Sequence, residues 1–440
     1  MQRKKEGELV ECYYIDAKYI DSKNITFKFA ANQYNMLKTF GENKAIKLVE
    51  IIDEITDGTR VKREYTDGGV RIINISDFKN GSIYPYNVKS ISKINVKEKD
   101  YVKEGDILIS AIGRSGQLAI IDHELQDCVI SSDVIRVRLK DVSKARGLVA
   151  YLYSKLGQLA IESIKTGVLN RISVSDVKDI VLPQNFNELS NENLDVVKHQ
   201  KHANKLFEEC TRMLNKYLHQ DEMLFEQLKS TYVDMININL LRLDPLYYFY
   251  YESELYKSTH KDSDEFKWQC LKDVVEIKTS ARPEIEENAI TKYINLSNID
   301  SDLSVIKNNE IGKFSELSNR IRYLLNVDEI LTAKVGSATG TENHITAVVT
   351  SKYSNMMASD AFFNMIPRNI DPYYLLLLFK QPIILKQIEG LATGLHFKSM
   401  NKIDFENIRV PRIIDEGAIA VKMREYVNVL EEYYGQMSES

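Results

Sequence analysis

Two stretches of this chain carry the same sequence features in the same order. The first runs from Gly105 to Pro183 and opens with GDILISAIGRSGQLAI, an apolar strand, a glycine turn and a second apolar strand. The second runs from Asp328 to Pro411 and opens with DEILTAKVGSATG. Each continues through a further strand-like segment, SSDVIRVRL or ASDAFFNMI, to a Thr-Gly pair and a final proline. The repeat predicts that one module is built twice.

The spacing of matched residues supports a duplication. Leu271 follows Leu48 by 223 residues, Gly336 follows Gly113 by 223, Gly394 follows Gly167 by 227, and Pro411 follows Pro183 by 228. Loop insertions make an offset drift by a few residues, whereas chance similarity of strands would not keep the order. We therefore expect an α+β chain with two tandem, similar α/β modules.

Helical segments with coiled-coil seams follow each module. From Leu194 to about Val233 there is no Gly or Pro, and apolar residues recur at steps of four and three, with Asp221 as the one polar intruder: Ala203, Phe207, Cys210, Leu214, Tyr217, Leu224 and Leu228. Ile419, Met423, Tyr426, Val427, Leu430 and Tyr433 continue this rule from about Glu416 to Met437. A helix of about 40 residues would span about 60 Å. We interpret the first helix as a spacer; the alternative is a long helix packed on a globular core.

Four segments follow from this pattern. We expect a first recognition module at residues 1–187, a central helical spacer at 188–235, a second module at 236–413, and a C-terminal helix at 414–440 that pairs with the spacer. Two copies held apart by helices can place two reading heads at a fixed separation on a quasi-periodic ligand. DNA is the obvious ligand of this kind.

Composition narrows the class of protein. The net charge of −5 gives no global basic signature, so DNA binding would rest on local patches. The four cysteines, at 12, 128, 210 and 270, form no Cys-x-x-Cys pair, which disfavours disulfides and zinc and indicates a reducing cytoplasm. The charged N-terminus precedes no apolar signal region, and no run of about 18 apolar residues predicts a membrane span.

The glycine turns, residues 112–116 and 335–340, are the first candidate contacts to DNA. Glycine permits positive φ and the close approach of another backbone, here that of DNA. Donors at or beside them are Arg114, Ser115, Ser337 and Thr339. The alternative is an ordinary β-turn. A nucleotide-phosphate loop is excluded because no Gly-Lys-Ser/Thr follows.

The segments after each Thr-Gly pair are the second candidate. Asn170 and Arg171 follow the first pair, and His396 and Lys398 follow the second. Arginine commonly reads guanine and asparagine adenine, so different side chains at matched positions fit two heads with different preferences. The alternative is drift in a surface loop. Gly167 and Gly394 are plausible helix C-caps.

Basic residues in both modules are candidate phosphate contacts, although solvated charge is the usual explanation for such runs. They are Arg60, Lys62, Arg63 and Arg71 in the first module, and Lys278, Arg282, Arg320 and Arg322 in the second.

No catalytic constellation is found. Asp371-Pro372-Tyr373-Tyr374 is superficially like the Asp-Pro-Pro-Tyr motif of amino-methyltransferases, but it has one proline and no Phe-x-Gly-x-Gly loop precedes it. We interpret Asp371 as a helix N-cap with Pro372 at the first helical position. The histidines show no metal spacing, and no Gly-x-Ser-x-Gly or Walker motif is present.

Taken together, the residues resemble the specificity subunits of type I restriction–modification systems. The resemblance rests on Gly105–Ser110 with Gly113-x-x-Gly116, on Thr-Gly after a helix, on Ile-x-Leu/Val-Pro at Ile180–Pro183 and Ile408–Pro411, and on their tandem repetition.

The resemblance implies two target recognition domains, each reading half of a bipartite DNA sequence, and helices that set the gap and dock two methyltransferase subunits. Those partners would hold S-adenosylmethionine, and motor-nuclease subunits would use ATP; this chain would bind no cofactor or metal and catalyse nothing. Alternatives are a non-catalytic two-module scaffold, an enzyme with a hidden cofactor loop, and the DNA-reading subunit of a methylation-only or phage-defence system.

Overall fold

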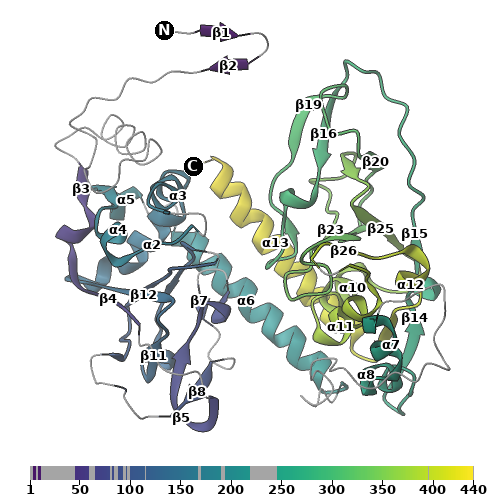
Figure 1. The fold of residues 1–440 in the computed structure, drawn as a ribbon, viewed down its shortest axis with the longest axis horizontal. Coiled ribbons are helices and arrows are strands. Elements are labelled where there is room, and N and C mark those ends of the chain that lie inside the picture. Colours follow the sequence, from purple (N-terminus) through teal and green to yellow (C-terminus); the bar gives the residue numbers. More distant parts are fainter. Residues whose placement is uncertain are drawn as a thin grey trace. The chain divides into compact units, whose positions relative to one another are not determined.

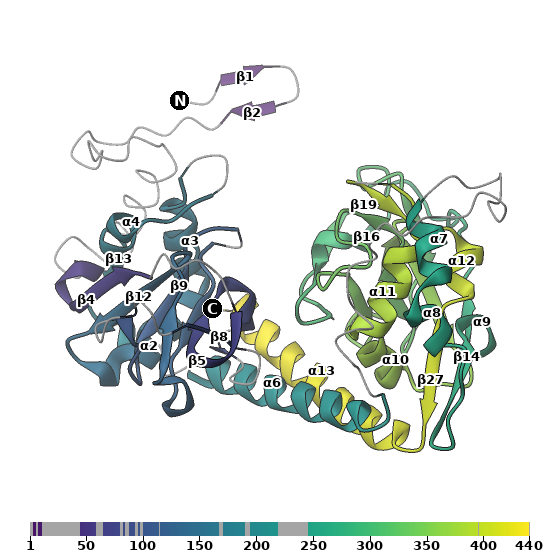
Figure 2. The ribbon, with the colours of Figure 1, turned by 60° about the horizontal axis from the view of Figure 1, so that its bottom comes forward.

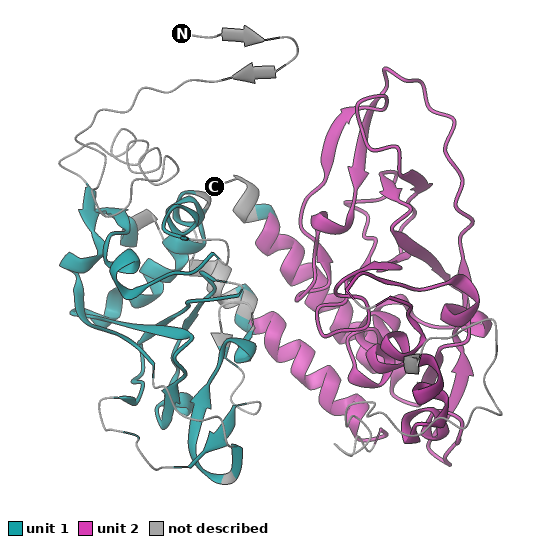
Figure 3. Cartoon of the chain, in the orientation of Figure 1, with its two compact units in different colours: residues 1–201, 435–440 teal, residues 202–434 magenta. Residues whose placement is uncertain are grey.

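The computed structural model divides the chain into two compact units (Figures 1 and 3). Unit 1 comprises residues 1–201 with 435–440, and unit 2 comprises residues 202–434. The residues described are 3–5, 8–10, 45–58, 65–79, 82–83, 88–92, 96, 100–113, 115–166, 170–189, 194–218, 245–394 and 396–439. Each unit is described by itself.

A four-stranded antiparallel sheet forms the centre of unit 1, in the order β10-β9-β12-β4. Its strands are β4 (Ile52–Asp57), β9 (Ile107–Ser110), β10 (Leu118–Ile120) and β12 (Val134–Leu139). β9 is buried at every position, as expected for a short, continuous apolar run. Helices α2 (Ala145–Tyr153) and α3 (Lys155–Ser163) pack their apolar residues into the same core.

A second sheet in unit 1 has the order β11-β5-β8, and β11 runs parallel to β5. The strands are β5 (Tyr65–Ile73), β8 (Lys89–Ile91) and β11 (Cys128–Ile130). Smaller elements are the pairs β1 (Arg3–Lys5) with β2 (Glu8–Val10) and β6 (Phe78–Lys79) with β7 (Ser82–Ile83), the pair β3 (Ala45–Lys47) with β13 (Val181–Pro183), and helices α4 (Val174–Lys178) and α5 (Phe186–Leu189).

Unit 2 repeats this topology, with one further strand in its second sheet. Its central sheet has the order β15-β25-β21-β23, and its second sheet has the order β19-β16-β24-β20 with β16 parallel to β24. The strands are β15 (Val275–Ile277), β16 (Ile290–Ile294), β19 (Glu310–Lys313), β20 (Ile321–Leu324), β21 (Ile330–Ala333), β23 (Thr346–Val348), β24 (Met357–Ser359) and β25 (Phe362–Pro367). The pairs β14 (Phe266–Cys270) with β27 (Arg409–Ile413) and β17 (Ile299–Asp300) with β18 (Val305–Ile306) complete the match.

The repeat extends to single hydrogen bonds. The amide of Leu48 donates to the carbonyl of Ile180 at 2.8 Å, and the amide of Leu271 donates to that of Ile408 at the same distance. The closing prolines lie on the two-stranded pairs, Pro183 opposite Ala45 and Pro411 opposite Trp268. The predicted tandem α+β architecture is confirmed.

The helices of the second module lie before and after its two four-stranded sheets along the chain. They are α7 (Pro245–Glu252), α8 (Glu254–Ser258), α9 (Leu271–Val274), α10 (Pro372–Leu378), α11 (Pro382–Leu391) and α12 (Lys402–Glu406). Asp371 caps α10 by accepting from the amide of Tyr373 at 2.8 Å, with Pro372 in the first turn, as predicted. In the part of the chain that the structure describes, no helix is long and apolar enough to cross a membrane.

Helices α6 (Leu194–Asn215) and α13 (Glu416–Glu439) run side by side, as Figure 2 shows. Cys210 and Leu214 on α6 and Met423 and Leu430 on α13 are buried in one cluster, and Lys422 donates to Glu209 at 2.7 Å. This cluster also contains the core of the second module, so within unit 2 these helices pack on a globular body as well as on each other.

The predicted helix to about Val233 is described only as far as Leu218, and the rest of it stays a prediction. Its described part, α6, ends at Asn215 after 22 residues, about 33 Å, and Tyr217 and Leu218 follow in a turn. Their amides donate to the carbonyl of Leu214, Leu218 is buried, and the hydroxyl of Tyr217 donates to Asp415 at 2.9 Å. The seam positions Leu224 and Leu228 lie outside the described residues.

Candidate nucleic-acid interface

The first glycine turn and the loop after α3 come together in unit 1. The turn leaves β9, and the amide of Ile172 donates to the carbonyl of Ala111 at 2.9 Å. The hydroxyl of Ser115 donates to the carbonyl of Asn170. Thr166 and Arg171 close the loop with two backbone hydrogen bonds of 2.8 Å. Two motifs predicted separately therefore form one surface.

Unit 2 joins its equivalent segments by a short strand pair. β22 (Val335–Gly336) pairs with β26 (Lys398–Ser399), and the amide of Met400 donates to the carbonyl of Lys334 at 2.8 Å. Thr393 and Ser399 close the loop after α11 with two backbone hydrogen bonds of 2.8 Å. We call each combination of glycine turn and post-helix loop the turn–loop surface of its module: residues 112–116 with 166–171, and 335–340 with 393–399.

The second glycine of each turn makes room for a helix of the same module. Gly116 and Gly340 have φ of 88° and 75°. A Cβ at Gly116 would collide with Ile161 on α3, and one at Gly340 would lie 2.6 Å from the amide nitrogen of Glu389 on α11. At these two glycines the close approach that the Cβ-free residue allows is made by a helix of the same module, and contact with DNA stays a prediction. Gly113 has no atom within 4 Å of its Cβ position and faces open space.

The hydroxyl groups predicted to contact DNA are mostly turned inward. Ser115 is only 6% exposed and Thr339 only 1%, and the Thr339 hydroxyl has no hydrogen-bond partner among the described residues. Ser337 is exposed. Arg114 lies outside the described residues. In the described part of the turns, Ser337 is thus the predicted donor that faces solvent.

Of the four side chains predicted to read bases from the post-helix loops, three are exposed and one is turned inward. Asn170, at φ 50°, and Arg171 are exposed, and so is His396. Lys398 is turned back, with its side chain 12% exposed and its ammonium group 3.1 Å from Glu389. Although burial opposes the shift, hydrogen bonds from Lys386 and Lys398 lower the pKa of Glu389. Lys398 is therefore occupied in anchoring its loop.

The closing bridges correct the predicted matching of the two loops. Thr166 pairs with Arg171 and Thr393 pairs with Ser399, so Arg171 corresponds to Ser399 rather than to Lys398. The second loop is one residue longer between its bridge partners, and simple counting from the Thr-Gly pairs misaligned the residues beyond the insertion.

Several of the basic residues predicted to contact phosphates are bound by carboxylates or carbonyls of their own module. Arg71 binds the carboxylate of Asp127 and the carbonyl of Glu124. Arg320 donates to Asp360 at 2.6 Å, and Arg322 donates to the carbonyls of residues 319 and 321 at 2.7 Å. Arg282 is exposed and stands 5.5 Å from the ring centre of Phe314. The candidates Arg60, Lys62 and Arg63 lie outside the described residues.

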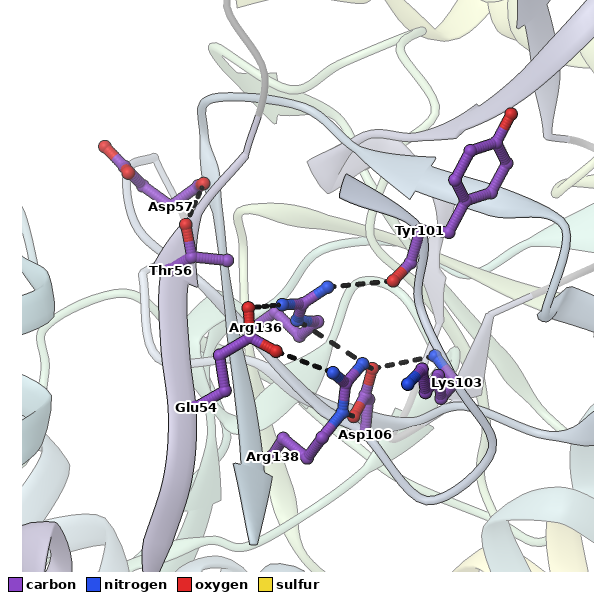
Figure 4. A network of polar contacts seen from close by, with 8 residues as sticks. All are labelled: Glu54, Thr56, Asp57, Tyr101, Lys103, Asp106, Arg136 and Arg138. Carbon is purple, nitrogen blue, oxygen red and sulfur yellow. Dashed lines mark hydrogen bonds and ion pairs between the residues drawn. The ribbon is translucent and has the colours of Figure 1, made fainter. Parts of the chain in front are cut away.

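A buried network of ion pairs joins β4 and β12 of unit 1 to the residue before β9. In unit 1, the carboxylate of Asp106 is 1% exposed and receives hydrogen bonds from Arg138 at 2.8 and 2.7 Å, while Arg136 reaches Glu54 at 2.6 Å (Figure 4). These residues come from β4, β12 and the turn before β9.

At the position equivalent to Asp106, 223 residues on, unit 2 has Glu329, which is also buried. Lys278 donates to it at 2.7 Å, with Asn326 and Asn364 at 2.6 and 2.7 Å. The predicted phosphate contact Lys278 thus neutralises a buried acid. Sequence reasoning missed these networks, although the Arg-Val-Arg of β12 placed two cations on a buried strand.

Phe397 is an exposed residue that sequence reasoning did not select. Its side chain is 67% exposed at the tip of the second loop, beside His396. The available signal was a large apolar residue in a loop that begins with Thr-Gly. In the described part of the chain, no group of three or more His, Cys, Asp or Glu residues could hold a metal ion.

Comparisons with known proteins bear on the first module. Residues 41–184 match the family described as the type I restriction modification DNA specificity domain, which confirms the resemblance over that range. No curated protein matches the sequence.

Solved structures resemble the chain at low similarity. They include the type I restriction–modification S subunit from M. genitalium (14% identity, 91% of this chain and 92% of that chain, TM-score 0.32) and the HsdS subunit from Thermoanaerobacter tengcongensis (12%, 90% and 93%, 0.26). The type IIG restriction endonuclease BpuSI matches over 40% of this chain and 31% of that chain (11%, 0.31). TM-scores this low carry no weight, and the assignment stands on residues 41–184.

Proposed function

From the premise that residues 41–184 form a type I restriction–modification DNA specificity domain, we propose that this chain selects the DNA target of a type I restriction–modification complex. Each module reads one half of a bipartite, asymmetric sequence. The observation that carries the proposal is the repeated topology: unit 2 has the same central strand order, the same parallel pair and the same closing proline as the matched domain. A second copy of a reading domain has a use if the target has two halves.

The turn–loop surfaces are the proposed sites of base reading. Exposed polar side chains stand there on backbone fixed by paired hydrogen bonds: Asn170 and Arg171 in the first module, and Ser337 and His396 in the second. Side chains held this way can specify base edges because their ordering costs little on binding. The scaffold is shared and the exposed side chains differ, as two half-sites of different sequence require.

The two long helices and the partner subunits have separate roles in the proposed complex. α6 and α13 set the gap between half-sites and dock two methyltransferase subunits, and a complete restriction system adds motor-nuclease subunits. Those partners supply S-adenosylmethionine, ATP and all catalysis, and the chain works in the cytoplasm. A methylation-only or phage-defence system would use the same reading modules, and a scaffold without DNA would not need different side chains at matched loops.

The test is selection from random DNA. The full-length chain, co-expressed with its methyltransferase partners, is mixed with a library of random duplexes at about 150 mM salt, since non-specific phosphate contacts dominate at low salt. The proposal predicts enrichment of two short conserved blocks separated by a fixed gap. If the purified complex enriches no sequence, the proposal fails.

A further inference from the structure

The loop between Thr393 and Ser399 is closed by hydrogen bonds between its two ends. Besides the two backbone hydrogen bonds of the bridge, the hydroxyl of Thr393 donates to the carbonyl of Ser399 at 3.1 Å. Gly394 has φ 97°, and a Cβ there would collide with the carbonyl oxygen of Phe397. The backbone of Gly394 therefore lies close against that of Phe397, and this position requires glycine.

The side chains of His396, Phe397 and Lys398 point in different directions. Lys398 folds back onto Glu389, while His396 and Phe397 point into solvent. The Phe397 side chain is 67% exposed to solvent, although the preceding helix α11 is packed in the core of the second module. Single exposed apolar residues are common, so exposure alone assigns nothing. What sets Phe397 apart is its place in the turn–loop surface, next to the bridge of Thr393 with Ser399 and with its carbonyl against Gly394.

We propose that Phe397 determines specificity in the second half-site by an apolar contact between its ring and the 5-methyl group of a thymine. The inference rests on the proposed function and deepens it. Thymine alone among the bases carries a methyl group in the major groove, and an uncharged ring can distinguish it without a hydrogen bond. The polar groups beside the ring, at His396 and Ser337, then contact base edges or phosphates around that thymine.

The experiment pairs a change in the protein with a change in the DNA. The wild-type chain with its methyltransferase partners first selects its consensus duplex. Each thymine of the consensus is then replaced by uracil, which removes one methyl group and keeps the Watson–Crick pairing. Affinities are measured for wild type, Phe397→Ala and the control Val327→Ala. Val327 is also exposed, in the same module, but it precedes β21, whereas the turn follows that strand.

The proposal predicts one thymine, in one half-site only, at which uracil weakens wild-type binding about fourfold, the value of one buried methyl group. Phe397→Ala should bind the consensus about tenfold more weakly and be indifferent to uracil at that thymine, with an unchanged salt dependence because no phosphate contact is lost. Val327→Ala should behave as wild type.

Two results overturn the inference while leaving the proposed function standing: selective binding that is equal in wild type and Phe397→Ala, or weakened binding by Phe397→Ala with no thymine methyl dependence. A wild-type complex that selects no sequence would instead refute the proposed function.

Discussion

The guanidinium group of Arg138 donates two hydrogen bonds, of 2.8 and 2.7 Å, to the buried carboxylate of Asp106. The bond pair links β12 to the residue that opens β9, the strand from which the first glycine turn leaves. Arg136, whose side chain is fully buried, lies 3.8 Å from the same carboxylate. Charge in the core of this module is thus neutralised by charge, at the strand from which the turn leaves.

Replacing Asp106 by alanine should therefore destabilise the first module strongly. Removal of one member of a buried ion pair leaves the other charge uncompensated, and we expect a loss of about 3–5 kcal/mol. Urea unfolding measures the loss in free energy of unfolding, and hydrogen exchange at the amides of β9 and β12 locates that loss in the first module. Asp127→Ala removes the partner of Arg71 at a mainly exposed site and should cost about 1 kcal/mol or less. Equal losses in the two variants would contradict the account.

Gly340→Ala should destabilise the second module and displace its loop. The residue has φ 75°, and an added Cβ would lie 2.6 Å from the backbone of α11, so both strain and overlap oppose alanine. We expect a loss of at least about 2 kcal/mol. Gly417→Ala, at an open position on α13, should be neutral or slightly stabilising. Thermal unfolding compares the midpoint temperatures of the two variants with that of the wild type. An unchanged midpoint for Gly340→Ala would refute the packing argument.

The stability of the second module should fall in mild acid because of His344. Burial, with a smaller contribution from Lys380, lowers the pKa of His344 to about 3. Its Nδ1 accepts from the amide of Gly340 at 3.3 Å, and its Nε2 lies 2.8 Å from the hydroxyl of Thr332. The folded pKa lies below the unfolded value of about 6.5, so this contribution is complete above pH 6.5 and is lost as pH falls towards 3.

Between pH 7 and pH 5 the loss from this site should be about 2 kcal/mol. His344→Gln should be less stable at pH 7 but should lack this part of the pH dependence. Urea unfolding of both proteins at the two pH values gives the difference. If the two proteins lose equal stability between pH 7 and pH 5, His344 does not titrate as described.

Arg171→Ala should relax base preference in one half-site only. Among the described residues, no acceptor holds the exposed Arg171 guanidinium group, and its backbone is fixed by the bridge to Thr166. Loss of a bidentate base contact costs about 1–3 kcal/mol at the position read. Binding to single-base variants of the selected duplex measures it. Arg146→Ala, an exposed arginine in the first turn of α2, is the matched control and should change nothing. Loss of preference in both half-sites would contradict separate reading.

The sequence predicted the parts of the fold that depend on local chemistry and order. The repeat, the Asp371 cap and the seam of α13 followed from spacing, capping and periodicity. Side-chain direction could not be predicted, because tertiary contacts decide it. Ser115, Thr339 and Lys398 turn inward, and Lys278 serves Glu329, a residue 51 positions away. The end of α6 at Asn215 could not be predicted either, because no Gly or Pro marks it in the sequence.

The most direct test of the central claim is an exchange of the first module. Residues 45–187 are replaced by the corresponding module of another specificity subunit with a known target, and methylated sites are mapped across a genome in cells that express the chimaera and its methyltransferase partners. We predict that one half of the bipartite target changes to that of the donor, while the other half and the gap stay as they were. A change in both halves, or methylation without any sequence preference, would contradict the account.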